Sequence, residues 1–333
     1  MTPYLITHDL SIGYRRADRI IASHLNLALA SGELVCVLGA NGAGKSTLMR
    51  TLAGMQPPLH GEVRIDQVSI ARLAPADLAR KISLVLTDRI DVGLLTARDV
   101  VALGRHPYTD WAGRMRPEDH AAVERALDGV GAAHLADRHV HHLSDGERQK
   151  IMIARALAQD TPLIILDEPT AFLDLPRRAE IMSVLRRLAH DMGRAVLLTT
   201  HDLELAVRNA DHVWLFGGDQ QIAVGAPEDL ILSGAFAAAF DSGGIHFHPE
   251  TGAFTISGGV RGAIRVIGAG VRALWTERAL ERAGYAIVSH AEDVVEVTEN
   301  GLWRGMICGK QRDVRSLDEL VRWVRSVGER VPT

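Results

Sequence analysis

The 333-residue sequence predicts an α/β protein with a largely parallel sheet, followed by a small C-terminal α+β domain. Apolar, strand-like runs alternate with helical patterns through most of the chain, as in a parallel sheet flanked by helices. The run ELVCVLG at 33–39 is nearly all apolar, which suits a strand covered on both faces. Shorter strand-like runs follow a glycine pair at 243–244, so we place the domain boundary there.

The expected elements follow in order along the chain. In the first domain, 1–242, we expect strands at 4–14, at 24–40 with a turn at 31–32, at 162–169 and at 195–202, and helices at 96–105, 116–131, 145–159 and 176–193. Pro117 and two acids open the second of these helices and glycines close it, which favours a helix there. In the second domain, 245–333, we expect strands at 254–258, 263–268, 285–290, 293–297 and 303–308, and helices at 275–284 and 316–328.

Composition excludes several classes of function. The net charge of −4, from 37 basic and 41 acidic residues, gives no broad basic field, so we expect no nucleic-acid partner. Cys36 and Cys308 lie far apart in apolar surroundings, which favours reduced thiols. No apolar run reaches the length of about 18 residues that spans a membrane, and the first residues do not resemble a signal peptide. We therefore expect a cytoplasmic protein that meets a membrane only through a partner.

The stretch GANGAGKST, Gly39–Thr47, follows the buried strand and precedes a helical segment. It fits the phosphate-binding pattern G-x-x-x-x-G-K-[ST], in which glycines let backbone N–H groups surround phosphate oxygens. Lys45 would reach the β- and γ-phosphates, and the Ser46 hydroxyl would bind Mg²⁺. We expect the nucleotide to contact Gly39, Asn41, Gly42, Ala43, Gly44, Lys45, Ser46 and Thr47.

Polar residues end two of the later strands. The strand LIIL is followed by Asp167 and Glu168, and the strand AVLLTT is followed by His201. Because α/β sheets bind ligands at the carboxyl ends of their strands, these residues should lie near the phosphate loop. Asp167 would then be a Mg²⁺ partner, Glu168 the base that polarises water, and His201 a contact of the γ-phosphate.

The stretch LSDGE, 143–147, contains a capping box, in which Ser144 and Glu147 exchange hydrogen bonds at the start of a helix. A capping box needs no function. Gly146, however, lies in the first turn, where glycine costs about 1 kcal/mol relative to alanine. This placement suggests that the backbone there comes close to another group.

Taken together, the phosphate loop, LSDGE, ILDEP, FLD at Phe172–Asp174 and then His201 resemble the ATP-binding cassette (ABC) ATPases, over roughly residues 1–240. The resemblance implies a P-loop NTPase core with a parallel sheet, an antiparallel β subdomain and a helical signature subdomain at about 88–160. It implies that ATP and Mg²⁺ are bound and ATP is hydrolysed. Tyr14 would stack on the adenine ring; the alternative is an exposed tyrosine at a strand end.

In that family two cassettes face each other head to tail. The resemblance therefore implies a homodimer in which Ser144 and the Gly146 backbone of one copy bind the γ-phosphate held by the other. Asp174 would couple the two sites. On this hypothesis Gly146 is small because the phosphate comes close.

The sequence departs from the family pattern at two positions. Asp145 stands where the signature usually has glycine, which puts the strength of the closed dimer in doubt. Thr87 stands where the family has a glutamine that contacts the metal or water. A water could fill the space, Asp88 could take part of the role, or the metal contact could be lost.

The absence of membrane helices, coiled coils and a second phosphate loop favours a cassette that serves a separate permease. The stretch VVALGRHPYTDW at 100–111 resembles importers of ferric siderophores, haem and cobalamin. This implies a permease of FecCD-like type, a substrate-binding protein, and a position on the inner face of the membrane. An ordinary helix end would explain Gly104 and Pro107, but not Arg105, Tyr108 and Trp111 as well.

Other interpretations remain open. An ATP-gated regulatory or assembly protein that meets no permease is the alternative function. The stretch VIGAG, 266–270, is a weak match to a dinucleotide-binding loop, and we interpret the C-terminal domain as a dimer-contact or sensing domain. The histidine groups HVHH and HFH, at 139–142 and 246–248, are predicted to be solvated and not metal ligands.

Overall fold

The computed structural model describes residues 3–15, 19–86, 93–218, 220–240, 245–248, 252–256, 261–298 and 300–328. The chain divides into two compact units. One comprises 1–241 with 247–253, and the other comprises 242–246 with 254–333. Each unit has its own hydrophobic core.

A central sheet organises the first unit, as the alternating sequence pattern predicted. Its strands run in the order β11-β10-β4-β9-β8-β7, and every neighbouring pair is parallel except β10 with β11. The bounds are β4 Leu34–Leu38, β7 Ile82–Val85, β8 Leu163–Leu166, β9 Ala195–Thr199, β10 His212–Phe216 and β11 Ile222–Gly225. All residues of β4, β8 and β9 are buried, which confirms a sheet covered on both faces.

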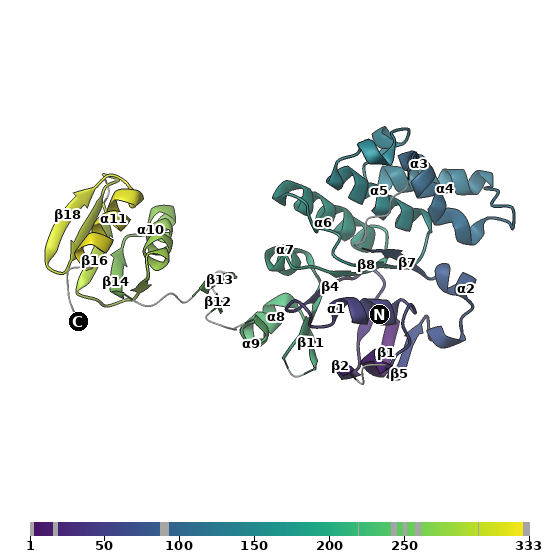
Figure 1. Ribbon diagram of the computed structural model, residues 1–333, viewed down its shortest axis with the longest axis horizontal. Helices are drawn as coiled ribbons and strands as arrows, with labels where there is room; N and C mark the ends of the chain where they lie inside the picture. The colour runs from purple at the N-terminus through teal and green to yellow at the C-terminus, as the bar shows by residue number, and fades with distance from the viewer. Residues whose placement is uncertain are drawn as a thin grey trace. The chain divides into compact units, whose positions relative to one another are not determined.

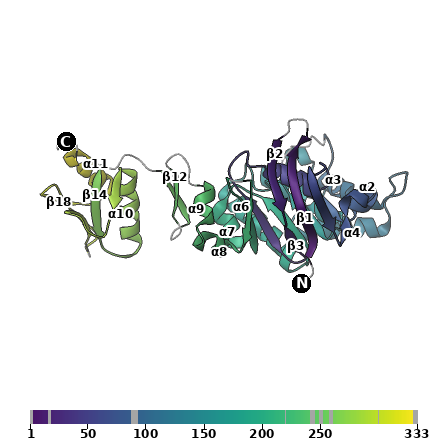
Figure 2. The same ribbon diagram turned by 90° about the horizontal axis from the view of Figure 1, so that it is seen from below.

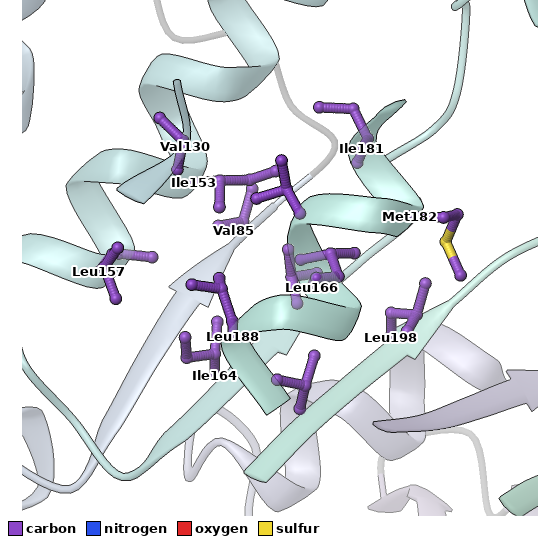
Figure 3. Packing of buried hydrophobic residues seen from close by; sticks show 14 of the residues in the cluster. Val85, Val130, Ile153, Leu157, Ile164, Leu166, Ile181, Met182, Leu188 and Leu198 are labelled. Carbon is purple, nitrogen blue, oxygen red and sulfur yellow. The ribbon is translucent and has the colours of Figure 1, made fainter. Parts of the chain in front are cut away.

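Helices cover this sheet and separate two cores. Alternate residues of β4 face opposite sides: Cys36 belongs to one hydrophobic cluster and Val37 to the other. On the first side, side chains of β7, β8 and β9 pack against α6, Leu175–His190 (Figure 3). The helices α7 (Leu203–Asn209), α8 (Pro227–Leu232) and α9 (Ala235–Phe240) add buried side chains to this core. Helix α1 (Lys45–Leu52) packs into the second core.

An antiparallel sheet packs against the second core and supplies the antiparallel subdomain that the resemblance implied. Its strand order is β2-β1-β5-β6, and β3 also pairs with β1. Strands β1, β2 and β3 of this sheet are labelled in Figure 2. The bounds are β1 Pro3–Tyr14, β2 Arg19–Leu25, β3 Ala28–Ala30, β5 His60–Ile65 and β6 Val68–Ser69. A 3₁₀ turn, Ile70–Arg72, and the short helix α2, Pro75–Ala79, lead from it to β7.

Three helices gather on the side of the central sheet that faces away from the antiparallel sheet (Figure 1). They are α3 Ala97–Ala102, α4 Pro117–Gly129 and α5 Asp145–Ala158, joined by 3₁₀ turns at Leu103–Tyr108, Ala133–Leu135 and Val140–His142. Thr96 and Asp99 form a capping box at the start of α3, within the helix expected at 96–105. In α5, the buried residues Ile151, Ala154 and Leu157 form the apolar face of the helix.

A buried ion pair braces these three helices. The Arg105 guanidinium donates to Asp119 Oδ1 at 2.9 Å and to the Ala158 carbonyl at 2.8 Å, and it lies over the Tyr108 ring. Burial alone would raise the pKa of Asp119, but hydrogen bonds from the Arg116 backbone and from Arg105 outweigh it and lower that pKa. The GRHPY stretch therefore has a structural role within this chain.

The second unit is a two-layer α+β arrangement. Its sheet has the order β15-β14-β16-β17-β18, in which β14, β15 and β16 are parallel and the rest antiparallel. Both helices pack on this sheet and against each other. The bounds are β14 Gly262–Ile267, α10 Gly270–Arg282, β15 Tyr285–Ile287, β16 Asp293–Val297, β17 Trp303–Ile307, β18 Lys310–Val314 and α11 Leu317–Gly328. A separate hairpin pairs β12, Ile245–His248, with β13, Ala253–Ile256.

Three details of this unit differ from the sequence analysis. Helix α10 begins at Gly270, earlier than the expected helix at 275–284. β15 ends at Ile287, earlier than the expected strand at 285–290. β18 was missed because its run KQRDV is polar and only Val314 is buried. An edge strand with a single buried side chain carries little apolar periodicity.

Replacing Asp119 with alanine leaves Arg105 buried without its partner charge. We expect the free energy of unfolding to fall by about 3–5 kcal/mol, the range for breaking one side of a buried ion pair. Chemical denaturation measures this change. Glu204→Ala is the matched control, because Glu204 pairs with Arg208 on the exposed surface, where a pair contributes about 0–1 kcal/mol. Equal losses in both variants would contradict the bracing role.

Candidate functional site

The predicted phosphate loop lies between the buried strand β4 and helix α1. Gly44 is the N-cap of α1 with φ 109°, and a Cβ there would lie 2.1 Å from Ile21 Cγ2. Gly39 has φ 147°, and its Cβ would lie 2.7 Å from that of Phe216. Only glycine fits these two positions, and the resulting turn directs the N-terminal end of α1 toward the loop.

Lys45 curls back across the loop. Its ammonium group donates to the Gly39 carbonyl at 2.8 Å and to the Ala40 carbonyl at 3.1 Å. Burial lowers the pKa of Lys45, while the nearby Glu168 and Asp167 carboxylates act to raise it. A cation beside exposed loop N–H groups is a site for an anion of several charges.

Carboxylates end β8 beside this loop. Asp167 Oδ1 accepts from the Thr199 hydroxyl at 2.6 Å and lies 3.5 Å from Ser46 Oγ. Hydroxyl and carboxylate oxygens are the ligands that Mg²⁺ takes, with water and phosphate completing its coordination. Ser46 and Asp167 therefore fit a Mg²⁺ ion that a bound phosphate completes. Thr87, the third predicted ligand, falls outside the described residues.

Glu168 and His201 form a hydrogen-bonded pair at the ends of neighbouring strands. Glu168 Oε1 lies 2.5 Å from His201 Nε2. Glu168 has a left-handed backbone, with φ 51°, which is uncommon for a residue with a side chain. The structure thus brings together the predicted base and the predicted γ-phosphate contact.

A cavity of about 250 Å³ joins these groups. Tyr14 lies at its edge, 43% exposed, with its hydroxyl 3.1 Å from Thr47 Oγ1. The cavity is lined by Tyr14, Arg19, Ile21, Asn41, Gly42, Gly44, Lys45, Ser46, Thr47, Glu168 and His201. Its chemistry, cationic and amide-lined near the loop and aromatic at the edge, fits a nucleotide with a phosphate chain.

Sequence reasoning missed Arg19 and Ile21. Arg19 lies opposite Tyr14 in the register of β1 and β2. An alternation of side chains along β2 could have placed Arg19 and Ile21 on the same face. The register that puts this face beside the phosphate loop could not be predicted locally.

Gly39, Ala43 and Asp167 are not in the cavity lining, although they belong to the phosphate loop and to the adjoining end of β8. Three further predicted residues lie outside the cavity and away from the loop. Ser144 caps α5, and the predicted capping box with Glu147 is present. Asp174 caps α6 by accepting from the Arg177 N–H at 3.0 Å. Gly146 is buried in the first turn of α5. Within one chain, therefore, Ser144, Gly146 and Asp174 lie at the starts of α5 and α6 and do not take part in the cavity at the phosphate loop.

The first histidine group lies at the surface, outside this cavity. His139, His141 and His142 are exposed, with their rings near one another. Within the ranges that the structure describes, no group of three or more His, Cys, Asp or Glu side chains is placed to hold a metal ion. No helix among these residues is long and apolar enough to cross a membrane.

Known proteins share both parts of the chain. Residues 22–171 match the ABC transporter family, and residues 261–325 match the iron ABC transporter C-terminal domain. A relative from Methanocaldococcus jannaschii, named "Uncharacterized ABC transporter ATP-binding protein MJ0873", is 44% identical over 227 residues, 68% of this chain and 78% of the relative. The chain belongs to the ABC transporter family. As an ABC ATPase, it binds and hydrolyses ATP.

Other members extend the comparison. The ferric enterobactin transport ATP-binding protein FepC of Escherichia coli is 36% identical over 225 residues, 68% of this chain and 82% of that protein. A solved structure titled "An inward-facing conformation of a putative metal-chelate type ABC transporter" has a TM-score of 0.64 and 30% identity, covering 72% of this chain and 89% of its own. The dimeric bacterial cassette MJ0796 has a TM-score of 0.58 and 27% identity, covering 67% and 98%.

The ABC signature of this chain has a packing neighbour that the sequence did not indicate. A Cβ on Gly146 would lie 3.2 Å from Arg177 Cδ, so Arg177 already packs against this glycine. Arg177 pairs with Glu180 at 3.0 Å, and Glu180 pairs with Lys150 of α5 at 2.5 Å. Gly146 therefore has a reason to be small within a single cassette, and its predicted role beside a phosphate remains a prediction.

The substitution Gly146→Ala separates these two reasons. Alanine favours the helix by about 1 kcal/mol, and the flexible Arg177 side chain can move by a few tenths of an ångström. We expect the free energy of unfolding to change by less than about 1 kcal/mol. We expect ATPase activity to fall by about 10- to 100-fold, because the methyl group would displace an approaching phosphate.

The control is the double substitution Gly146→Ala with Arg177→Ala, compared with Arg177→Ala alone. Recovery of activity in the double variant would mean that crowding against Arg177 causes the loss. Steady-state ATPase assays and thermal unfolding give both answers.

Proposed function

We propose that this chain is the ATP-hydrolysing subunit of an importer that takes up a metal chelate, of the iron-siderophore, haem or cobalamin type. The observation that carries this proposal is the pairing, in one chain, of a hydrolytic site with a C-terminal part that matches a domain of iron ABC transporters. The similarity to the ferric enterobactin protein supports the same cargo class. The two predicted domains, 1–242 and 245–333, would correspond to the motor and an accessory dimer-contact or sensing domain.

In this proposal the triphosphate binds to the loop amides of Gly39–Thr47 and Tyr14 stacks on adenine. Lys45 exchanges its carbonyl partners for the β- and γ-phosphates. Ser46 and Asp167 would hold Mg²⁺, which supplies positive charge to the bridging phosphate oxygens. Most of the rate enhancement then comes from positioning and electrostatic stabilisation.

Glu168 is the proposed base. Its carboxylate is close to the phosphate loop, and the hydrogen bond to His201 fixes its direction. When the γ-phosphate is bound, His201 would contact it and Glu168 would polarise the attacking water. Thr87 is retained as a predicted metal or water contact.

The catalytic site is completed in a dimer. ABC cassettes dimerise, as in MJ0796, and Ser144, Gly146 and Asp174 do not line the cavity of their own chain. We place Ser144 and the Gly146 backbone of the partner subunit at the γ-phosphate, with Asp174 between the two sites. Each cassette would thus finish the pocket of the other.

A second cavity is the proposed docking place for the permease. It has a volume of about 400 Å³ and is lined mainly by apolar side chains. Met55 and Leu103 line it and are 55% and 53% exposed. Its lining includes Leu84 of β7 in the central sheet and Leu103 and Arg155 of the helical part. These two parts are joined there, because Arg155 of α5 donates to the Leu84 carbonyl at 3.0 Å.

An apolar segment of a permease, of FecCD-like type, would fill this cavity. The chain would then lie on the inner face of the cell membrane, and a substrate-binding protein would deliver cargo from the other side. Co-purification with a polytopic membrane protein tests this arrangement against the ATP-gated regulator.

The substitution Glu168→Gln tests the hydrolytic site. We expect ATP binding to persist, turnover to be lost, and a nucleotide-bound dimer to accumulate, because the amide cannot accept the proton of water. ATP titration, steady-state ATPase assays and size-exclusion chromatography measure the three effects. Glu204→Gln, on the exposed surface, is the control. Unchanged turnover in Glu168→Gln would reject the assignment.

The substitution Leu103→Glu tests the docking cavity. A carboxylate there would lose its hydration when an apolar segment binds, so we expect permease association to fall by about tenfold or more. Basal ATPase activity of the isolated subunit should stay unchanged. Leu232→Glu, at a side chain 83% exposed that does not line this cavity, is the matched control. Full association of the Leu103 variant would argue against this site.

A further inference from the structure

Thr199, the last residue of β9, holds both carboxylate residues of the site. Its side chain is fully buried. The hydroxyl donates to Asp167 Oδ1 at 2.6 Å and accepts from the Glu168 backbone N–H at 2.8 Å. The same hydroxyl group therefore donates a hydrogen bond to one candidate site residue and accepts one from the next.

The chain needs such a contact where β8 ends. The Asp167 N–H still donates to the Val85 carbonyl of β7 at 2.8 Å, on one side of β8. At Glu168 the backbone turns into the left-handed region, and its N–H points to β9 on the other side. Thr199 supplies the acceptor for that N–H, so the turn that aims Glu168 at His201 is anchored to the neighbouring strand.

The hydroxyl is not explained by packing. β9 reads AVLLT, and its other residues are aliphatic and buried. Valine has nearly the same shape as threonine and suits a buried strand equally well. The described contacts of the hydroxyl go to Asp167 and Glu168. Threonine at this position therefore orients these two residues, which valine could not do.

We propose that Thr199 is a positioning residue for ATP hydrolysis, which sets the Asp167 carboxylate toward Mg²⁺ and the Glu168 carboxylate toward the attacking water. This inference rests on the proposed roles of Asp167 and Glu168. Residues that orient metal ligands typically change metal affinity or activity by about 10- to 100-fold when they are removed.

The test compares Thr199→Val with Thr199→Ser. We expect Thr199→Val to lower kcat by about 10- to 100-fold and to weaken the Mg²⁺-dependent gain in ATP affinity by about tenfold. The affinity for ATP in EDTA should change little, because binding without Mg²⁺ does not need these carboxylates. Thr199→Ser restores the hydroxyl and should stay within a few-fold of the unmodified protein.

Thr161→Val is the matched control. Thr161 is also buried, and its hydroxyl lies 3.0 Å from Ser83 Oγ and 2.9 Å from the Leu163 carbonyl, near the opposite end of β8. We expect its kcat and Mg²⁺ dependence to match the unmodified protein, even where thermal unfolding shows a loss of stability. If Thr199→Val does not fold, Thr199→Ala replaces it in the same comparison.

The outcomes are distinct. Normal kcat and Mg²⁺ dependence in Thr199→Val, or equal kcat losses in Thr199→Val and Thr161→Val, would overturn the positioning role. So would a Thr199→Ser variant as impaired as the valine variant. If Glu168→Gln itself retains turnover, the proposed catalytic assignment fails; if it is inactive and Thr199→Val is normal, only this inference fails.

Discussion

The burial of β4, β8 and β9 on both faces is the constraint on which the rest of the structure depends. A strand covered on both sides has no place for a charged side chain along its length, so polar groups collect where the strand ends. Because these strands are parallel, their carboxyl ends meet at one edge. The phosphate loop, Glu168 and His201 come together there for this reason.

This arrangement explains why part of the site could be predicted from the sequence. Gly39–Thr47, the acids after LIIL and the capping box at Ser144 are local patterns, and each fixes its own conformation over a few residues. Arg19 and Thr199 were missed because their roles come from strand register. Arg19 acts across from Tyr14, and Thr199 reaches Asp167 from the next strand. No local pattern in either segment records such a pairing.

For the fold, too, local patterns were predicted from the sequence and pairings between strands were not. The largely parallel sheet and the antiparallel subdomain followed from apolar runs and from the resemblance, although the order of the strands did not. The polar edge strand β18 did not. Arg105 shows a different limit. An ordinary helix end did not explain this residue in the sequence, whereas the structure gives it an internal ion pair with Asp119. Gly146 likewise contacts Arg177 of its own chain. A motif can satisfy a packing need and a binding need together.

The signature helix illustrates how both needs can be met. The Ser144 N–H donates to Glu147 Oε2 at 2.8 Å, and the Ser144 hydroxyl lies 2.9 Å from the same oxygen. The first turn of α5 is thus satisfied in a lone cassette and does not need a nucleotide to be stable. In the proposed dimer the serine proton would turn from Glu147 to a phosphate oxygen, while the backbone bond to Glu147 keeps the helix capped. The helix end can therefore bind and release an anion without unfolding, as a cycle of ATP binding and hydrolysis requires.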